Sequence, residues 1–400
     1  MEWKEVRLGD VCDLIAGFAF KAKDFGEFPT KVIKIGDIKP PFVDYVGQVG
    51  VDISNYDINR LSKYTVKYGD YVLAMTGATI GKVGKYISKN FSYINQRVLK
   101  FSPKQNVDAD YINYIICSNI FAKYVVNYVD SESAQPNISA STISKFAFQI
   151  PSEKDDQRRI ASILSSLDRK IELNNKINAD LEEMAQAIFK NWFVDFEPFK
   201  DGKFVDSELG MIPEGWKVVV FDNILKVTTT KTGKEGIPEY SVTNTGIHPR
   251  DEKFTKNLSK SSAKNKLIRK GNLVFGMSRE ILNWGIMKEE VGGVSSAYNV
   301  YIVDEKIVST TYLECFIAQR MDYFADLIKP ASREGQGVDK ALLMKKIICI
   351  PPSEVLDVFL EKYNSIMHLT EIRNQENSRL STLRDTLLPR LMSGELEVPE

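Results

Sequence analysis

The hydrophobic residues of the chain predict one very long helix, at residues 153–195. Apolar side chains recur there every three or four positions and form a single stripe, while charged residues occupy the other faces. Residues 353–393 carry a similar stripe, and a proline precedes each segment (Pro151 and Pro352), as expected where a helix begins after a breaker. A helix of about 60 Å cannot bury such a stripe alone, so we expect the two helices to pair. The stripes comprise Ile160, Leu164, Leu167, Ile171, Asn174, Asn178, Leu181, Ala185, Ile188 and Trp192, and Leu356, Phe359, Tyr363, Ile366, Thr370, Asn377, Leu380, Leu383, Leu387 and Leu391.

Both stripes turn polar near the middle, at Asn174 and Asn178 in the first and at Asn374 and Asn377 in the second. Buried asparagines cost stability but fix the register and number of paired helices. The alternative is that these side chains face water on two unrelated surface helices. The polar positions fall at the same place in both segments, which favours pairing.

Shorter patterns fill the rest of the chain and predict two globular α/β domains. Alternating runs in residues 1–152 indicate strands, and residues 108–129 have the spacing of a core helix. The same order returns later, because WKVVVFDNI matches WKEVRLGDV and KGNLVFGM matches YGDYVLAM. We expect a mixed α/β fold in which two similar α/β domains alternate with two long helices that pair as an antiparallel coiled coil. The expected parts are a first domain (1–152), a first long helix (153–197), a second domain (198–352, with a linker at 198–213), a second long helix (353–393) and a tail (394–400).

Composition narrows the class of protein. The 53 basic residues balance the 53 acidic ones, which argues against a binder that relies on a high overall positive charge. The four cysteines are scattered and only two histidines accompany them, so we expect no metal site and reduced thiols. No signal peptide or membrane-spanning run is recognisable, and we expect a cytoplasmic protein with no membrane contact.

Several catalytic motifs nearly occur, and each lacks a residue that its chemistry needs. Residues 77–84 (GATIGKVG) resemble a phosphate-binding loop but are one residue short and have no hydroxyl for magnesium. Residues 39–42 (KPPF) resemble the NPPF motif of amino-methyltransferases, but lysine offers no acceptor to a target amine. The sequence therefore indicates a binding protein that is not an enzyme and holds no cofactor of its own.

Basic residues gather in both domains. Nine lie between Arg60 and Lys104 against one acidic residue, Asp70, and a second cluster occupies residues 253–270. Such patches suit contacts with DNA phosphates, although a solvated lysine-rich face is the alternative for either patch alone. Base reading needs Arg, Lys, Asn or Gln on loops that can enter a groove. The predicted DNA contacts are Lys63, Thr76, Thr79, Lys82, Asn95, Gln96, Arg97, Gln135 and Asn137 in the first domain, and Lys264, Lys266, Ser278, Arg279, Asn283, Ser295, Ser296, Arg333 and Gln336 in the second.

Across nearly its whole length the chain resembles the specificity (S) subunits of type I restriction-modification systems. The resemblance rests on WKEVRLGDV, GDYVLAMTGATIGKVG, INQRVLKF, the first long helix through LEEMAQAIFKNWFVDF, GMIPEGW and TLLPRLMSGEL. The second half departs from the family pattern, because SREILNWGIM replaces GATIGKVGKY and LDVFLEKYNSIM lacks the QRRIA signature.

The resemblance implies that each domain is a target-recognition domain for one half of a split, asymmetric site in double-stranded DNA. It implies that the paired helices set the gap and dock two methyltransferase (M) subunits, and that a motor-nuclease (R) subunit can join. S-adenosylmethionine and ATP would be bound by those partners. We predict partner docking at Ile188, Phe189, Trp192, Phe193, Leu387, Leu388 and Leu391.

Packing of the aromatic helix end onto the second domain is the alternative to docking. The exposed stripe also predicts self-association when the partner is absent. Two other functions stay open from sequence: a stand-alone DNA-modifying enzyme with an unrecognised site, and a coiled-coil scaffold that does not bind DNA.

Overall fold

The computed structural model describes residues 1–398 except 130–135, 251–260, 279 and 329–337. The chain forms two compact units. The first contains Met1–Asn175 and Asn374–Glu400, and the second contains Lys176–Arg373. The long helices α6 (Lys154–Phe193) and α12 (Ser353–Met392) each contribute one part to each unit.

The first unit holds two sheets and a strand pair. Strand β1 (Trp3–Arg7) pairs antiparallel with β12 (Ala147–Pro151), directly before α6. The six-stranded sheet has the order β2 (Cys12–Ala16), β11 (Val98–Pro103), β8 (Tyr71–Ala74), β9 (Val83–Lys85), β5 (Phe42–Val43) and β4 (Ile38–Lys39). The four-stranded sheet has the order β6 (Val49–Val51), β3 (Phe25–Ile33), β10 (Ser92–Ile94) and β7 (Thr65–Val66). The helices are α1 (Leu8–Val11), α2 (Ile58–Ser62), α3 (Ala109–Ile116), α4 (Asn119–Asn127) and α5 (Ala140–Ser144).

The second unit repeats this order with shorter sheets. Strand β15 (Lys217–Val220) pairs with β24 (Ile347–Ile350), directly before α12. A four-stranded sheet has the order β16 (Leu225–Thr228), β23 (Asn299–Val303), β20 (Leu273–Phe275) and β21 (Trp284–Ile286). Three strand pairs are β13 (Phe204–Val205) with β14 (Ile212–Pro213), β17 (Tyr240–Thr243) with β18 (Gly246–Pro249), and β19 (Lys266–Arg269) with β22 (Val291–Val294). The helices are α7 (Phe221–Ile224), α9 (Thr310–Gln319), α10 (Met321–Phe324) and α11 (Lys340–Lys345).

The repeat extends to single hydrogen bonds. The buried hydroxyl of Tyr111 on α3 donates to the Gln149 carbonyl at 3.5 Å, and that of Tyr312 on α9 donates to the Cys349 carbonyl at 2.6 Å. Each acceptor lies two residues before the proline that ends the strand segment, at Pro151 and Pro351. The two units therefore share one internal register.

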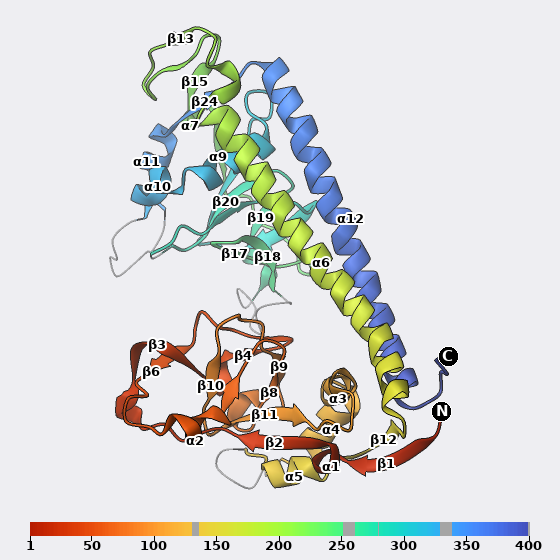
Figure 1. Cartoon of the computed structure of the whole chain (residues 1–400). Coiled ribbons are helices and arrows are strands. Elements are labelled where there is room, and N and C mark those ends of the chain that lie inside the picture. The colour runs from red at the N-terminus through yellow and green to blue at the C-terminus, as the bar shows by residue number, and fades with distance from the viewer. Residues whose placement is uncertain (130–135, 251–260, 279, 329–337, 399–400) are drawn as a thin grey trace. The chain divides into compact units, whose positions relative to one another are not determined.

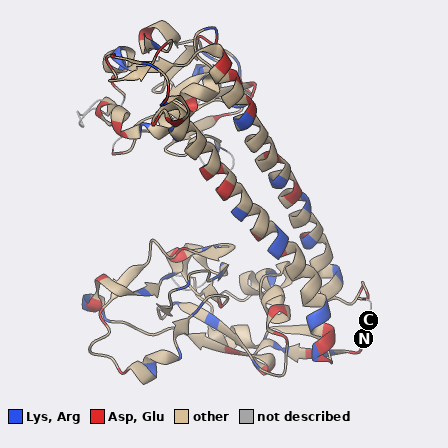
Figure 2. Ribbon diagram, turned by 45° about the horizontal axis from the view of Figure 1, so that its top comes forward, with Lys and Arg blue, Asp and Glu red and all other residues tan. Residues whose placement is uncertain are grey.

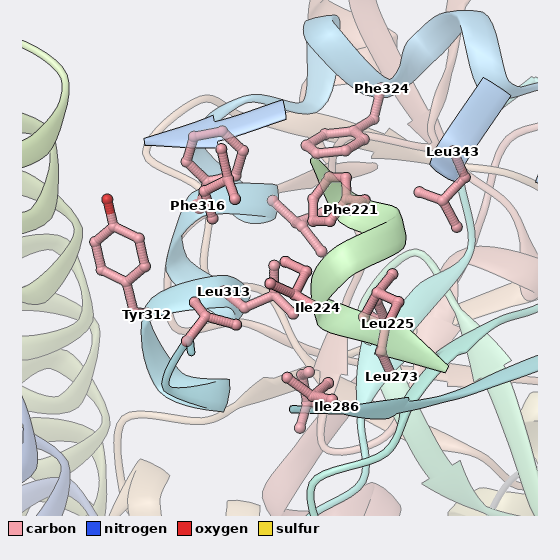
Figure 3. Close-up of a cluster of buried hydrophobic side chains, with 14 of the residues drawn as sticks. Phe221, Ile224, Leu225, Leu273, Ile286, Tyr312, Leu313, Phe316, Phe324 and Leu343 are labelled. Atoms are coloured by element: carbon pink, nitrogen blue, oxygen red, sulfur yellow. The ribbon is translucent and has the colours of Figure 1, made fainter. Parts of the chain in front are cut away.

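Each unit has its own hydrophobic core. In the second unit α7 packs toward α9 and α10 through side chains such as Phe221, Phe316 and Phe324 (Figure 3). Phe189 and Phe193 of α6 and Phe359 of α12 belong to this same core. Burial of these rings anchors the long helices to the globular part of the unit.

The long helices run antiparallel within each unit (Figure 1). In the first unit, Asp168 pairs with Arg384 at 2.8 Å and Asn174 donates to Asn377 at 2.9 Å, so residue numbers rise along α6 as they fall along α12. In the second unit, the ring centroids of Phe189 and Phe359 lie 5.7 Å apart. Acidic and basic residues are interspersed along both helices (Figure 2). The predicted mixed α/β fold with an antiparallel helix pair is confirmed.

The polar layer is also confirmed, with two corrections to the stripe. Asn174 and Asn178 are 0% and 7% exposed. In α12, however, Asn374 is exposed and so is Leu383, at 47%. A strict repeat of 3.5 residues drifts against the 3.6 residues of a helical turn, and here Arg384 takes the inward place.

The structure also bears on membrane contact. Among the described residues, no helix is both long enough and apolar enough to cross a membrane.

Candidate nucleic-acid interface

Three predicted DNA-contacting segments of the first unit meet at one sheet edge. Strands β8 and β11 are antiparallel neighbours, so the end of one lies beside the start of the other, with Ala74 opposite Val98. The Met75 amide donates to the Arg97 carbonyl at 2.9 Å, and the Ile138 amide donates to the Met75 carbonyl at 3.0 Å. These bonds bring together the loop at residues 76–82, the turn at residues 95–97 and Asn137.

The side chains at this edge offer the donors and acceptors that base reading requires. Lys82, Gln96, Arg97 and Asn137 are exposed, and Asn95 is half-buried. Paired donor and acceptor groups of Asn and Gln suit adenine, and those of Arg and Lys suit guanine. The geometry therefore presents a compact group of base-reading residue types on a rigid sheet.

An aromatic group supports this edge and was missed by sequence reasoning. Phe18 forms a parallel bridge with Asn95, and its ring lies 5.4 Å from that of Tyr64. The Lys63 ammonium lies 4.9 Å from the Tyr64 ring, and the Arg60 guanidinium lies 5.8 Å from the Phe18 ring. Cation–π contacts orient basic groups while leaving them hydrated. The sequence signal is GFAF after β2, in which aromatic residues alternate in strand fashion.

The second unit places its predicted contacts at the matching edge. Phe275 at the end of β20 lies opposite Asn299 at the start of β23, so residues 277–278 and 280–283 adjoin the turn at residues 295–298. The Gly276 amide donates to the Asn283 carbonyl at 2.8 Å. Ser296 is exposed and Ser295 is half-buried. In both units the loops lie at the same ends of two neighbouring strands, but the side chains on these loops differ.

Lys63 and Lys264 occupy equivalent positions in the two units. Lys63 lies two residues before Thr65, which pairs with Tyr93 of β10. Lys264 lies two residues before Lys266, which pairs with Val294 of β22. Both lysines are exposed. Sequence reasoning selected each of them without recognising that they match.

Lys266 has a structural role. Its Nζ donates to the Tyr298 carbonyl at 2.6 Å, which ties β19 to the turn at residues 295–298. Burial, followed by the charge of Lys340, lowers the pKa of Lys266. This hydrogen bond thus holds the turn at residues 295–298, which carries two predicted DNA contacts, against β19.

Two of the predicted DNA contacts are buried. Thr76 is 8% exposed and Ser278 is 0% exposed, so neither can reach a base in this conformation. Thr76 follows β8 and Ser278 follows β20, and neighbouring segments cover the chain at both places. The Ser278 hydroxyl accepts from the Asn283 amide at 2.9 Å, while the Asn283 side-chain amide donates to the Met277 carbonyl at 2.5 Å.

The hydroxyl oxygen of Thr79 is likewise buried, and within the described part of the chain it has no hydrogen-bond partner. Gln135, Arg279, Arg333 and Gln336 lie outside the described residues.

The predicted partner contacts at the helix ends pack against the hydrophobic cores of the chain itself. Phe189 and Phe193 are 1% and 5% exposed, and the Phe193 ring lies 4.9 Å from that of Phe359. Ile188 and Trp192 pack against the same core, half-buried. Leu387 and Leu388 are half-buried against the core of the first unit, and Leu391 is buried within it. The chain itself buries Phe189, Phe193 and Leu391 and partly covers the other four side chains, which favours the packing alternative that the sequence left open.

The described residues show no metal-binding group, and two of the four thiols are buried. Within the described ranges, no group of three or more His, Cys, Asp or Glu side chains is placed to hold a metal ion. Burial raises the pKa of the Cys12 and Cys349 thiols to about 12, so both are protonated at neutral pH and poor nucleophiles.

Comparison with known proteins gives one consistent family. The model of the type I restriction modification DNA specificity domain matches residues 1–183. The type I restriction enzyme MjaIX specificity subunit of Methanocaldococcus jannaschii is 29% identical over 349 residues, covering 82% of this chain and 78% of the relative. The HindI specificity subunit of Haemophilus influenzae is 25% identical over 472 residues, covering 99% of this chain and 100% of the relative.

A solved structure has the same fold. The type I restriction-modification system S subunit from M. genitalium superposes with a TM-score of 0.53 at 11% identity, covering 98% of this chain and 96% of that one. The domain match and the curated relatives make the chain similar, over most of its length, to type I restriction-modification specificity subunits.

Proposed function

We propose that this chain is the DNA-recognition subunit of a type I restriction-modification complex. Each globular domain reads one half of a bipartite, asymmetric site, and the helix pair sets the gap between the halves. One observation carries the proposal: both units present loops at the same sheet edge, but with different side chains. Equivalent edges suit equivalent docking on DNA, and different side chains suit different half-sites.

The chain itself acts by binding. Methylation would come from methyltransferase subunits that carry S-adenosylmethionine, and cleavage from a motor-nuclease subunit that uses ATP. The names of the relatives, which are specificity subunits of restriction enzymes, support these partners.

The burial of the predicted helix-end contacts moves the proposed docking surface to other side chains. Exposed apolar residues on the outer faces of the helices are available instead, at Leu173, Met184, Leu369, Ile372 and Leu383. Apolar side chains that remain exposed on charged helices suit a partner that covers them.

Replacement of Lys63 or Lys264 by alanine tests DNA binding at the two edges. Each lysine is placed for a phosphate contact, so each variant should bind every sequence more weakly. In the assembled complex, the slope of log K against log salt should fall in magnitude by about 0.9 per variant.

The matched control is Lys4→Ala. Lys4 is exposed on β1, which pairs with β12 away from the reading edge. The slope should not change in this variant. Unchanged slopes in Lys63→Ala and Lys264→Ala would contradict the proposed edges, and sequence-blind binding of the unaltered complex would favour the scaffold alternative.

A further inference from the structure

Asp168 links three elements of the first unit at one carboxylate. Its Oδ2 accepts from the Tyr114 hydroxyl of α3 at 2.6 Å, and its Oδ1 accepts from Nη1 of Arg384 in α12 at 2.8 Å. Asp168 itself lies on α6. One side chain therefore joins the globular part of the unit to both long helices.

The link lies just outside the hydrophobic core of the unit. On α6, Leu164 is the last residue of that core, and Asp168 follows one turn later. On α12, Leu388 belongs to the core contacts, and Arg384 precedes it by one turn. The bonds of this carboxylate thus join the globular part of the unit to both helices one turn beyond the last apolar contacts.

Both partners of Asp168 are held in place. Burial and the hydrogen bond to Asp168 raise the pKa of Tyr114 above its usual value, so the hydroxyl stays a donor. Arg384 also donates from Nε and Nη2 to Asp385 at 3.0 and 2.8 Å, which fixes the plane of its guanidinium.

The second unit has no equivalent of this group among its described residues. The register shared by Tyr111 and Tyr312 places Cys315 where the first unit has Tyr114. Cys315 interacts with Tyr363 of α12, and aromatic rings such as Phe193 and Phe359 fill the region. The first globule is thus joined to both long helices through one carboxylate, whereas the matching position of the second unit has a thiol–hydroxyl contact with α12 beside aromatic rings.

We propose that Tyr114, Asp168 and Arg384 fix the angle at which the first globule leaves the helix pair, and that they thereby determine which gap between half-sites is accepted. Apolar contacts are not directional and permit rocking, whereas hydrogen bonds restrict angle as well as distance. A small rotation at this base displaces the reading edge by a larger distance. These are positioning residues, and the inference rests on the proposed function.

The test uses the full chain assembled with its methyltransferase subunit. Methylation is measured on three DNA substrates, which have the preferred gap, one base pair fewer and one base pair more. Tyr114→Phe removes only the bond to the globule, and Asp168→Ala removes both bonds. Tyr114→Phe should reduce the preference for the correct gap about fivefold, the effect of losing one partly exposed charge-assisted hydrogen bond, and Asp168→Ala should reduce it further. The double variant should equal Asp168→Ala alone.

Lys170→Ala is the matched control. Lys170 pairs with Glu376 at 3.3 Å, so this contact also joins α6 to α12. Its removal should leave the gap preference unchanged.

The possible results separate the inference from the function on which it rests. If the unaltered complex methylates no two-part site, the proposed function fails. If it prefers one gap and Tyr114→Phe retains that preference, the positioning role is wrong. An equal loss of rate at all three gaps, or an equal change in Lys170→Ala, would also overturn it.

Discussion

Replacement of Phe193 by alanine should destabilise the second unit by about 3–5 kcal/mol, the usual range for a large aromatic side chain lost from a core. Phe193 is 5% exposed. Its ring lies 5.0 Å from that of Tyr312 and 5.8 Å from that of Trp216, so the truncation leaves a cavity between a long helix and the globular core.

The measurement is denaturant unfolding of the full chain, followed by a probe in the second unit. Phe42→Ala is the control, because Phe42 is 45% exposed and its loss should cost less than about 1 kcal/mol. Equal destabilisation by the two variants would show that Phe193 is not a core residue. Docking of a partner at the aromatic helix end would then return as the explanation for its hydrophobicity.

Replacement of Gly17 by alanine should abolish reading of one half-site while leaving the other intact. A Cβ atom at Gly17 would lie 2.2 Å from the Asn95 carbonyl oxygen and 2.5 Å from the Ile94 carbonyl oxygen. Both obstacles are backbone, so the turn at residues 95–97 must move. Loss of one good base contact costs about 1–3 kcal/mol, so affinity for the full site should fall by roughly tenfold or more.

The assay compares binding of the assembled complex to the full site and to sites with either half scrambled. In Gly17→Ala, scrambling the first half should have little further effect, and scrambling the second half should cost as much as in the unaltered chain. Gly36→Ala is the control, because a Cβ atom there meets nothing within 4 Å. Loss of discrimination at both halves would contradict a local role for this turn.

Periodicity predicted the parts of the fold that depend on local sequence. Apolar spacing located both long helices, and the buried asparagines marked their shared polar layer. The assignment failed at Leu383 because a repeat of seven residues does not fix which side of the seam each residue takes. Arg384 donates to Asp168 of α6, and the periodicity of a single helix does not contain that contact.

The candidate sites were predictable as loops but not as individual side chains. The positions of the loops follow from the duplicated strand order. The burial of Thr76 depends on a distant segment, because Ile138 bonds to the neighbouring Met75. The hydrophobicity of Phe189 and Phe193 showed that something covers them, but composition cannot tell the chain's own domain from a partner.

The central claim is that the two globular domains read the two halves of one split site. The most direct test is single-molecule mapping of methylated bases in DNA from cells that co-express this chain with its methyltransferase subunit. We expect a two-part, non-palindromic motif with a fixed gap, and replacement of residues 1–152 by those of a relative should change one half only. Assembly of the complex without any new motif, or a motif that appears without the methyltransferase subunit, would contradict it.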